Sequence, residues 1–358
     1  MKYNLRNLEK NVFTIFKKIG CNENDAKTVT EILLSAELRG IPSHGIIRIK
    51  DYLLLWAGNR IKTQPNIRIV HSTPTTAVVD GDSGFGMVVA KKAMEIAIEK
   101  SQQNFTGMVA VKNSNHYGIA GYYSMMALKH DMIGISMTNG NPLVIPTNSI
   151  DRFLGTNPIA VAIPANKEPP FVADFATTPI ARGKLELAEK KGEKVEFGLV
   201  QDKHGNPSQD PSILKHGGGI LPLGGDITHG GHKGFCLSSI VDIFSSVLSG
   251  ASFGPFVPPQ VAYLPLNQNA PGNGLGHFFT AMRIDAFQSA NDFKNYMDLW
   301  IQTFKKARPI EGIDMITIPG EPEREFEKKL SKEGITVNDK VLEELENTLE
   351  KLSIKSPF

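Results

Sequence analysis

The hydrophobic positions in the first sixty residues recur at helical spacing. Residues 5–20 and 24–40 each place apolar side chains three or four positions apart, and each run ends at a glycine, a common helix stop. Ser43 is a favourable N-cap, so the pattern predicts a third helix from Ser43 to Gly58. The chain is therefore expected to begin with three helices.

The middle of the chain changes to short β-branched or apolar runs bounded by Gly, Pro, Asn or Asp, which is typical of strands. These runs are residues 75–82, 106–113, 132–139, 158–164, 171–176 and 276–284. Helical spacing intervenes at residues 87–101, 119–130, 233–250 and 290–306, and returns at 321–334 and 338–352. We predict an α/β core over residues 66–309, embraced by a helical region made of residues 1–65 with 310–358.

Composition narrows the class of protein. The 39 basic and 37 acidic residues leave a formal net charge of +2, which argues against a nucleic-acid partner. Two cysteines, Cys21 and Cys236, make no disulfide framework and favour a reducing compartment. The most apolar stretch, residues 234–257, is interrupted by Asp242 and several serines, so it predicts a buried helix and no membrane span. We expect a soluble cytoplasmic protein without a secretory signal.

Two glycine-rich segments resemble nucleotide-binding loops only in part. Gly84 and Gly86 stand between a predicted strand and helix, but Val89 occupies the third small position of a dinucleotide fingerprint, so an ordinary tight turn is favoured. "GGDITHGGHKG", residues 224–234, departs from a Walker motif. It still offers backbone donors, with Lys233 at a predicted helix start, which suits an anionic group.

The same loop raises the alternative of a zinc site. Asp226, His229 and His232 have D-x-x-H-x-x-H spacing, and Cys236 follows. The glycines make a regular helix here unfavourable, so the spacing does not bring the side chains to one face. We favour a solvated loop and predict no metal.

Three other residues suggest proton exchange and carboxylate binding. His44 and Arg48 are four positions apart, which on a helix begun at Ser43 places an imidazole one turn from a guanidinium. A solvated helix end explains this pair equally well. His116 lies between a predicted strand and helix, where α/β proteins collect reactive groups. Neighbouring Asn113, Ser114 and Asn115 are candidates to orient its ring or to donate to an oxyanion, and function is favoured over a plain turn histidine.

Two strand-to-loop segments are less decisive by themselves. In "DFATTPIARGK", Asp174 ends a strand and two threonines supply hydroxyls, which fits either a ribose or phosphate cradle or a capped turn. In "LGTNPIAVAIP", Thr156 and Asn157 either face a ligand or simply lead into a buried strand.

Taken together, these segments resemble one family. "SHGIIRI", "NSNHYGIAGYYS", "LGTNPIAVAIP", "DFATTPIARGK", "LPLGGDITHGGHKGF", "LSGASFG", "GHFFTAM" and "IPGEPE" occur in its order and character. The chain resembles the type-2 malate/L-lactate dehydrogenases, a group that also includes L-sulfolactate and ureidoglycolate dehydrogenases, 2,3-diketo-L-gulonate reductase and piperideine-2-carboxylate reductase. The resemblance covers nearly the whole chain.

The resemblance implies a fold and a set of site residues. The expected fold is the non-Rossmann one of L-sulfolactate dehydrogenase, with a mixed, largely antiparallel sheet, in homodimers. His116 and His44 match residues assigned as acid/base or proton donor, and Arg48 matches the substrate-carboxylate arginine, with Thr156 a further substrate candidate. The matched cofactor positions are Asp174, Phe175, Ala176, Lys233, Pro319, Gly320 and Glu321. Gly140 departs from the serine that relatives often carry, so a cofactor hydroxyl contact is either lost or supplied by Thr138 or Asn139.

The predicted function is NAD- or NADP-dependent hydride transfer between nicotinamide and a small 2-hydroxy or 2-oxo acid, of malate or lactate type. The alternatives are reduction of another 2-oxo or imino acid (sulfolactate, ureidoglycolate, diketogulonate or piperideine-2-carboxylate type), a zinc hydrolase, or a nucleotide-binding module without catalysis. The substrate, the choice of NAD or NADP, and whether His44 or His116 is the principal acid/base stay open at this stage.

Overall fold

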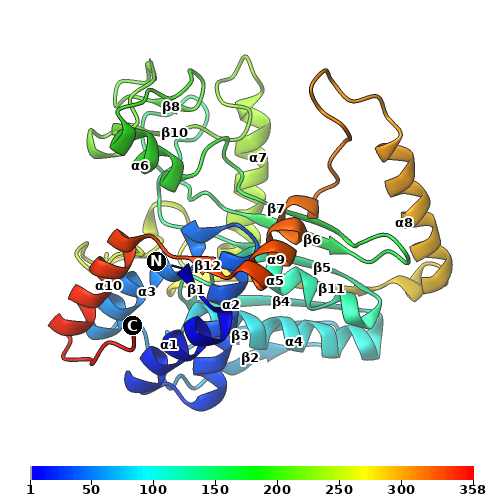
Figure 1. Cartoon of the computed structure of the whole chain (residues 1–358), viewed down its shortest axis with the longest axis horizontal. Helices are drawn as coiled ribbons and strands as arrows, with labels where there is room; N and C mark the ends of the chain where they lie inside the picture. Colours follow the sequence, from blue (N-terminus) through cyan, green and yellow to red (C-terminus); the bar gives the residue numbers. More distant parts are fainter. Residues whose placement is uncertain (1) are drawn as a thin grey trace.

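The centre of the molecule is a seven-stranded sheet in the order β2-β3-β4-β11-β5-β6-β7 (Figure 1). A computed structural model describes residues 2–358. The strands are β2 Arg68–Ser72, β3 Thr76–Asp80, β4 Thr106–Ser114, β5 Met132–Thr138, β6 Ile159–Ile163, β7 Phe171–Phe175 and β11 Leu275–Arg283. All neighbours are antiparallel except β3 and β4, which are parallel. The expected α/β fold with a mixed, largely antiparallel sheet is confirmed.

The predicted strands are all present, and the pattern missed β2 for a clear reason. All five residues of β2 are exposed, so this edge strand has no alternation of apolar and polar positions to reveal it. The opposite case is β11, which pairs with β4 on one side and β5 on the other. Its first seven residues are buried, because both faces of a central strand are covered.

Helices pack on both faces of the sheet and around it. The helices of the described residues are α1 Leu5–Lys18, α2 Glu23–Leu38, α3 Ile49–Ala57, α4 Gly86–Asn104, α5 Ala120–Met125, α6 Arg182–Lys191, α7 Gly231–Asp242, α8 Ala290–Lys305, α9 Glu321–Glu333 and α10 Asp339–Lys351. Neighbouring residues of β11 show the two faces: Phe279 packs against Tyr123 of α5, whereas Phe278 packs against Phe244 beyond α7. Helices α4 and α7 lie on opposite sides of the sheet in Figure 1.

The prediction of a fully buried helix over the apolar stretch is wrong for α7 and the π-helical turn that follows it, Ile243–Val247. The small side chains of Ser238, Ser245 and Ser246 face inward and are fully buried. The large apolar side chains face outward, with exposed fractions from 36% to 58%, and are Leu237, Ile240, Ile243, Phe244, Val247 and Leu248. Serines on the inner face let this helix lie close to the sheet, and leave its apolar face unpartnered. No helix within residues 2–358 is long and apolar enough to cross a membrane.

The predicted third helix also starts later than expected. Two short 3-10 turns, Pro42–His44 and Ile46–Arg48, precede α3, which begins at Ile49. Gly45 separates the turns with φ −97° and ψ −135°, values outside the helical region. Ser43 caps no helix, and His44 and Arg48 are consequently not one turn apart on a regular helix.

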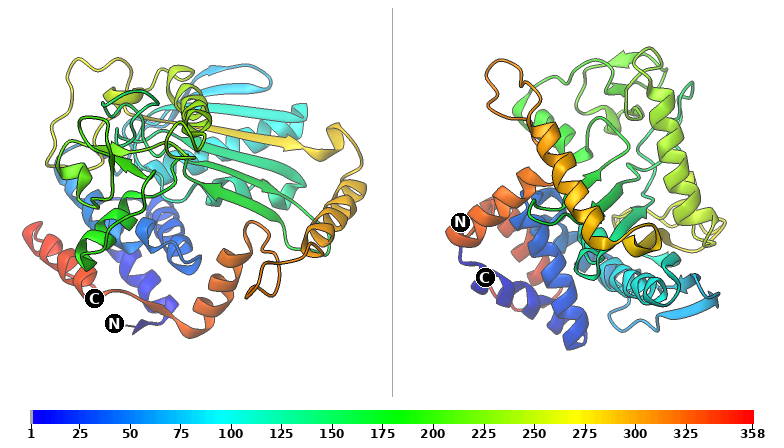
Figure 2. Two further views of the ribbon diagram at one scale, coloured as in Figure 1. Left: turned by 90° about the horizontal axis from the view of Figure 1, so that it is seen from above. Right: turned by 90° about the vertical axis from the view of Figure 1, so that its right-hand side faces the viewer.

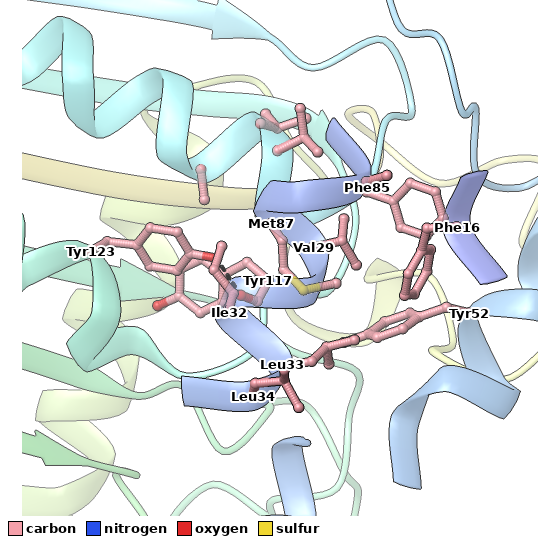
Figure 3. Close-up of a cluster of buried hydrophobic side chains, with 14 of the residues drawn as sticks. Phe16, Val29, Ile32, Leu33, Leu34, Tyr52, Phe85, Met87, Tyr117 and Tyr123 are labelled. Carbon is pink, nitrogen blue, oxygen red and sulfur yellow. Dashed lines mark hydrogen bonds between the residues drawn. The ribbon is translucent and has the colours of Figure 1, made fainter. Parts of the chain in front are cut away.

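The main hydrophobic core joins the ends of the chain to the sheet. Phe16 of α1 meets Phe85 before α4, and Tyr52 of α3 meets the same ring, both edge to face (Figure 3). At the surface, β1 (Lys2–Tyr3) pairs with β12 (Ile335–Thr336), and the termini lie side by side in both views of Figure 2. A second, smaller cluster around Val144, Leu185 and Ile220 supports the three-stranded sheet of β8 (Val200–Gln201), β9 (Pro207–Ser208) and β10 (Gly219–Ile220).

Candidate active site

Three strands of the sheet end at the same edge. Strands β4 and β5 are both antiparallel to β11 and therefore run in the same direction, and β7 shares that direction because β6 lies antiparallel between it and β5. Their last residues are Ser114, Thr138 and Phe175. The ends of these strands and the segments that follow them carry five of the predicted site residues, namely His116, Thr156, Asp174, Phe175 and Ala176.

His116 is held by a tyrosine that the sequence did not reveal. The hydroxyl of Tyr52 lies 2.7 Å from Nδ1 of His116, and the amide of Gly118 lies 3.4 Å from the same nitrogen. Tyr52 comes from α3, which the main core holds in place. Since a hydroxyl both donates and accepts, Tyr52 can serve the imidazole in either protonation state and leave Nε2 for a ligand. The sequence could have indicated Tyr52 as a site residue, because it lies one helical turn beyond Arg48.

His44 and Arg48 converge on this imidazole. The rings of His44 and His116 stack with centroids 5.6 Å apart and planes 28° apart. Ser43 Oγ lies 2.9 Å from Nδ1 of His44, and Nε of Arg48 donates to the Ser43 carbonyl at 2.7 Å. The structure thus brings together residues more than sixty positions apart.

The guanidinium of Arg48 keeps part of its donor set open. Its Nη1 contacts Asp51 at 3.3 Å, and both side chains are partly exposed. Its Nη2 makes no hydrogen bond to any residue from 2 to 358. A carboxylate can therefore approach the outer edge of the guanidinium in competition with Asp51.

The surroundings hold both imidazoles neutral. Burial, then the nearby Arg48, lower the pKa of His44 to about 4. Burial lowers the pKa of His116 well below 6.5, and the neighbouring His44, Arg48 and His277 push it the same way. Both rings nevertheless keep some surface accessible to solvent. The site is recessed and yet reachable, as proton exchange with a ligand requires.

The polar residues before His116 do not orient its ring, contrary to the sequence interpretation. Asn113 donates to Asp80 and accepts from Ser83, and Asn115 donates to the carbonyls of Ser83 and Gly84. These bonds build the turn that carries His116.

Gly86 at the start of α4 lets this turn lie against the helix. A Cβ at Gly86 would lie 2.0 Å from the Asn115 carbonyl oxygen and 2.4 Å from that of His116. The tight turn at Gly84 and Gly86 thus supports the histidine loop by close packing.

A third histidine lies beneath the pair. His277 of β11 is fully buried, with Thr138 Oγ1 2.7 Å from Nδ1 and Ser114 Oγ 2.7 Å from Nε2, and it stacks on Tyr117 at 4.7 Å. Burial lowers its pKa to about 3. Only the pairing of β11 with β4 and β5 brings these groups together, so local sequence patterns could not indicate them.

The predicted cofactor-binding residues Asp174 and Phe175 end β7, beside the loop that carries His116. The Oδ2 of Asp174 accepts from the Gly121 amide at 2.7 Å, next to the start of α5. Loss of solvent around the carboxylate raises the pKa of Asp174, although the residue as a whole is exposed. Phe175 is 41% exposed and Ala176 follows it, so an apolar ring stands open at the sheet edge.

Two further predicted cofactor segments lie near this stretch. The carbonyl of Pro319 accepts from the Val172 amide at 3.1 Å, which places Pro319–Glu321 beside β7. The carboxylate of Glu321 is occupied, since it pairs with Lys305 at 2.5 Å and accepts from the Ile318 amide. Gly320, at the N-cap of α9, lies close to β7, since a Cβ there would lie 3.0 Å from the Cβ of Val172.

Lys233 lies in the first turn of α7 and makes no ion pair with any residue from 2 to 358. The Leu223 amide donates to the Thr177 carbonyl at 2.9 Å, and the loop from Leu223 packs on the first turn of α7. This contact brings Lys233 to the same end of the molecule as Asp174.

Thr156 and Gly140 lie next to each other, near the end of β5. The Thr156 carbonyl accepts from the Thr177 amide, and Asn157 Oδ1 accepts from the Gly140 amide at 3.1 Å. Both residues named as replacements for the missing serine are engaged elsewhere. Thr138 contacts His277, and Asn139 donates to Asp242 and to the Ser252 carbonyl.

The histidines of the glycine-rich loop, His229 and His232, do not form a recessed pair like His44 and His116. Nδ1 of His229 lies 2.8 Å from Asp226 Oδ1, in an exposed turn. Across residues 2–358, no group of three or more His, Cys, Asp or Glu side chains is arranged to hold a metal ion.

A cavity of about 660 Å³ opens next to this edge and is lined by Asn141, Arg152 and Arg182 among others. Arg182 pairs with Glu186 at 2.7 Å and precedes Gly183, whose Cβ position would lie 3.8 Å from the Cβ of Ser43. The first turn of α6 is therefore close to the histidine pair.

Comparisons with known proteins show the family of this chain. The family model described as malate/L-lactate dehydrogenase matches residues 3–346. A malate dehydrogenase from Pyrococcus abyssi is 42% identical over 345 residues, which cover 96% of this chain and 93% of the relative. An L-sulfolactate dehydrogenase from Methanocaldococcus jannaschii is 38% identical over 348 residues, 97% of this chain and 96% of the relative.

Solved structures are equally similar. The sulfolactate dehydrogenase structure from Methanocaldococcus jannaschii superposes with a TM-score of 0.88, covering 99% of this chain and 98% of its own, at 36% identity. Malate dehydrogenase from Pyrococcus horikoshii superposes with a TM-score of 0.89 at 37% identity, covering 99% and 97%. The chain therefore belongs to the malate/L-lactate dehydrogenase family and is a 2-hydroxy acid dehydrogenase.

Proposed function

We propose that this dehydrogenase uses NAD or NADP, with His116 as the acid/base and Arg48 as the anchor of the substrate carboxylate. The observation that carries the proposal is the convergence of His116, His44 and Arg48 at one sheet edge. An imidazole that exchanges a proton and a guanidinium that grips a carboxylate are the two groups a 2-hydroxy acid needs.

In the oxidation direction, Nε2 of neutral His116 accepts the hydroxyl proton while Tyr52 accepts from the ring's Nδ1–H. The carbon–oxygen double bond forms as the hydride leaves the same carbon. A nicotinamide, when bound, would supply the acceptor or the donor of that hydride. In reduction, the imidazolium returns the proton, and His44 donates a hydrogen bond to the substrate.

The charge of Arg48 ties proton exchange to substrate binding. Arg48 is one of the positive groups that depress the pKa of His116. A substrate carboxylate on Arg48 offsets that charge and raises the pKa again. The imidazolium needed for reduction is therefore easiest to form when a 2-oxo acid is bound.

The residues around β7 fit a dinucleotide. The open ring of Phe175, with Asp174 and Ala176 beside it, suits an aromatic or ribose moiety, and Lys233 suits a phosphate. Backbone groups of Pro319, Gly320 and Glu321 would contact the far end of the cofactor, and Thr156 would face the substrate.

The names of the relatives favour a substrate with two acidic groups, malate or sulfolactate, over lactate. Arg182 lies in the adjoining cavity, close to Ser43, and is a candidate to bind the second acidic group. Its pairing with Glu186 would open to accept that group.

We also propose a homodimer in a reducing, cytoplasmic setting. The exposed apolar face of α7 and its π-helical turn is the kind of surface that another subunit covers. Cys21 and Cys236 are free thiols. Replacing Val247 by Glu should shift the mass in multi-angle light scattering from two chains to one.

A spectrophotometric panel tests the proposed activity. The enzyme is assayed with malate, sulfolactate, lactate and ureidoglycolate, each with NAD and with NADP. The absorbance of the reduced nicotinamide is followed. We expect turnover of malate or sulfolactate and slower turnover of lactate. Absence of turnover with all four substrates and both cofactors would overturn the proposed function.

A further inference from the structure

His44 and Arg48 stand on two consecutive 3-10 turns joined by Gly45. We define this segment, residues 42–48, as the elbow. The elbow has no side-chain cap of its own, and the first amide of its second turn belongs to Ile46. That amide donates to Oε1 of Glu37, which comes from α2, at 2.8 Å.

Glu37 fills the inside of the elbow. A Cβ built on Gly45 would lie 2.1 Å from Oε1, 2.6 Å from Cδ and 2.7 Å from Cγ of Glu37. The glutamate side chain therefore occupies the space that any side chain at position 45 would need. Gly45 and Glu37 are two halves of one contact.

Burial of the Glu37 carboxylate is energetically unfavourable. It is only 8% exposed and makes no ion pair with any residue from 2 to 358. Burial raises its pKa to about 7, against the smaller opposite effect of the Ile46 amide. An unpaired buried carboxylate is normally unfavourable for stability, so this one calls for a role other than stability.

We propose that Glu37 is a positioning residue, which sets the spacing and direction of His44 and Arg48 by holding the Ile46 amide inside the elbow. It touches neither substrate nor cofactor and acts through the two residues it places. This inference rests on the proposed function of His44 and Arg48. A displacement of about 1 Å at a reacting group can cost roughly a hundredfold in rate, so a lost hold on the elbow should be visible in catalysis.

The test compares Glu37→Ala and Glu37→Gln with wild type and with Glu31→Gln, which changes an exposed carboxylate on the same helix. Each enzyme is assayed with the best substrate of the wild type, and NADH binding is followed by fluorescence. We expect Glu37→Ala to lower kcat/KM by about thirtyfold or more. Glu37→Gln keeps an acceptor for Ile46 and should stay within about threefold, with NADH affinity unchanged throughout.

A double-mutant cycle with Gly45→Ala isolates the elbow. Gly45→Ala should damage the wild type, because its Cβ collides with the Glu37 carboxylate, and should add little to Glu37→Ala, where that space is empty. Hydrogen exchange at the Ile46 amide should be slow in wild type and Glu37→Gln and fast in Glu37→Ala. If Glu37→Ala does not fold, Glu37→Asp replaces it, with the shorter side chain withdrawn from the amide.

Two results overturn the inference: full activity of Glu37→Ala, or losses from Glu37→Ala and Gly45→Ala that simply multiply. A wild-type enzyme without turnover on any 2-hydroxy acid would instead overturn the proposed function. In that case the exchange rate of the Ile46 amide still decides whether Glu37 holds the elbow.

Discussion

The two groups of histidines in this chain lie in opposite environments. Asp226, His229 and His232 are close in sequence, and their loop is exposed, with the pKa of Asp226 lowered by hydrogen bonds from His229. His44 and His116 are remote in sequence, stacked and recessed, and burial depresses both of their pKa values. The cluster with metal-like spacing lies in a solvated loop, whereas the candidate active site is assembled by the fold. Reactivity follows from the surroundings of an imidazole more than from the spacing of its neighbours.

The largest contrast should come from replacing His116 by Ala. Loss of a general acid/base typically lowers turnover by about 10²- to 10⁴-fold, so kcat should fall by that amount while NADH affinity changes little. Steady-state kinetics and fluorescence titration measure both quantities. An unchanged kcat would remove His116 from its proposed role.

The buried carboxyl of Glu37 should make the stability of the protein depend on pH. Glu37 has a folded pKa raised from 4.5 to about 7, so its contribution to stability is fully present below pH ~4.5 and is lost as the pH rises through 7. Relative to wild type, Glu37→Gln should gain stability between pH 5 and pH 8, on the order of 3 kcal/mol. Urea unfolding at the two pH values measures this gain, with Glu31→Gln as the control. A gain independent of pH would contradict the assignment.

Arg48→Lys should mainly weaken substrate binding. The lysine keeps the charge but loses the planar pair of donors, so KM for the 2-hydroxy acid should rise roughly tenfold with a smaller change in kcat. Lys184→Met, which removes a cation from α6, is the comparison variant. An unaltered KM would mean that another residue holds the carboxylate.

The pH profile of the wild type separates the recessed pair from an ordinary imidazole. An unperturbed histidine is half protonated near pH ~6.5, which would halve a base-dependent rate there. Because the pKa of His116 is held well below 6.5, kcat/KM for oxidation should stay level from pH 8 down through 6.5 and fall only at lower pH. An acid limb centred at the ordinary value would show that the surroundings do not depress it.

The smallest effect is expected in the exposed loop. Asp226→Ala and His229→Ala remove a pair that lies in solvent, so both variants should keep the activity of the wild type. Dialysis against a chelator should leave activity unchanged as well. Inactivation by the chelator, together with bound stoichiometric zinc, would revive the hydrolase alternative.

Local sequence rules were sufficient for most elements and failed at particular places. The predicted strands follow from runs of β-branched residues, whereas exposed β2 shows no such pattern. The start of α3 was misplaced because Glu37 of α2 accepts a hydrogen bond from the Ile46 amide and so shapes the elbow, a contact that capping rules do not include. Helical spacing from Arg48 could have indicated Tyr52 as a site residue. It could not have indicated His277, because the partners of His277, Ser114 and Thr138, come from two other strands.

The sequence by itself determined the class of fold, the order of its elements, the near-neutral charge and the family, because these depend on local periodicity and on motifs read in order. Tertiary structure alone decided which histidine has a tyrosine partner, which carboxylate is buried without a cation, and which face of α7 stays apolar and open. These properties depend on the loss of solvent around a group and on contacts between distant segments. Neither is encoded in any single stretch of the chain.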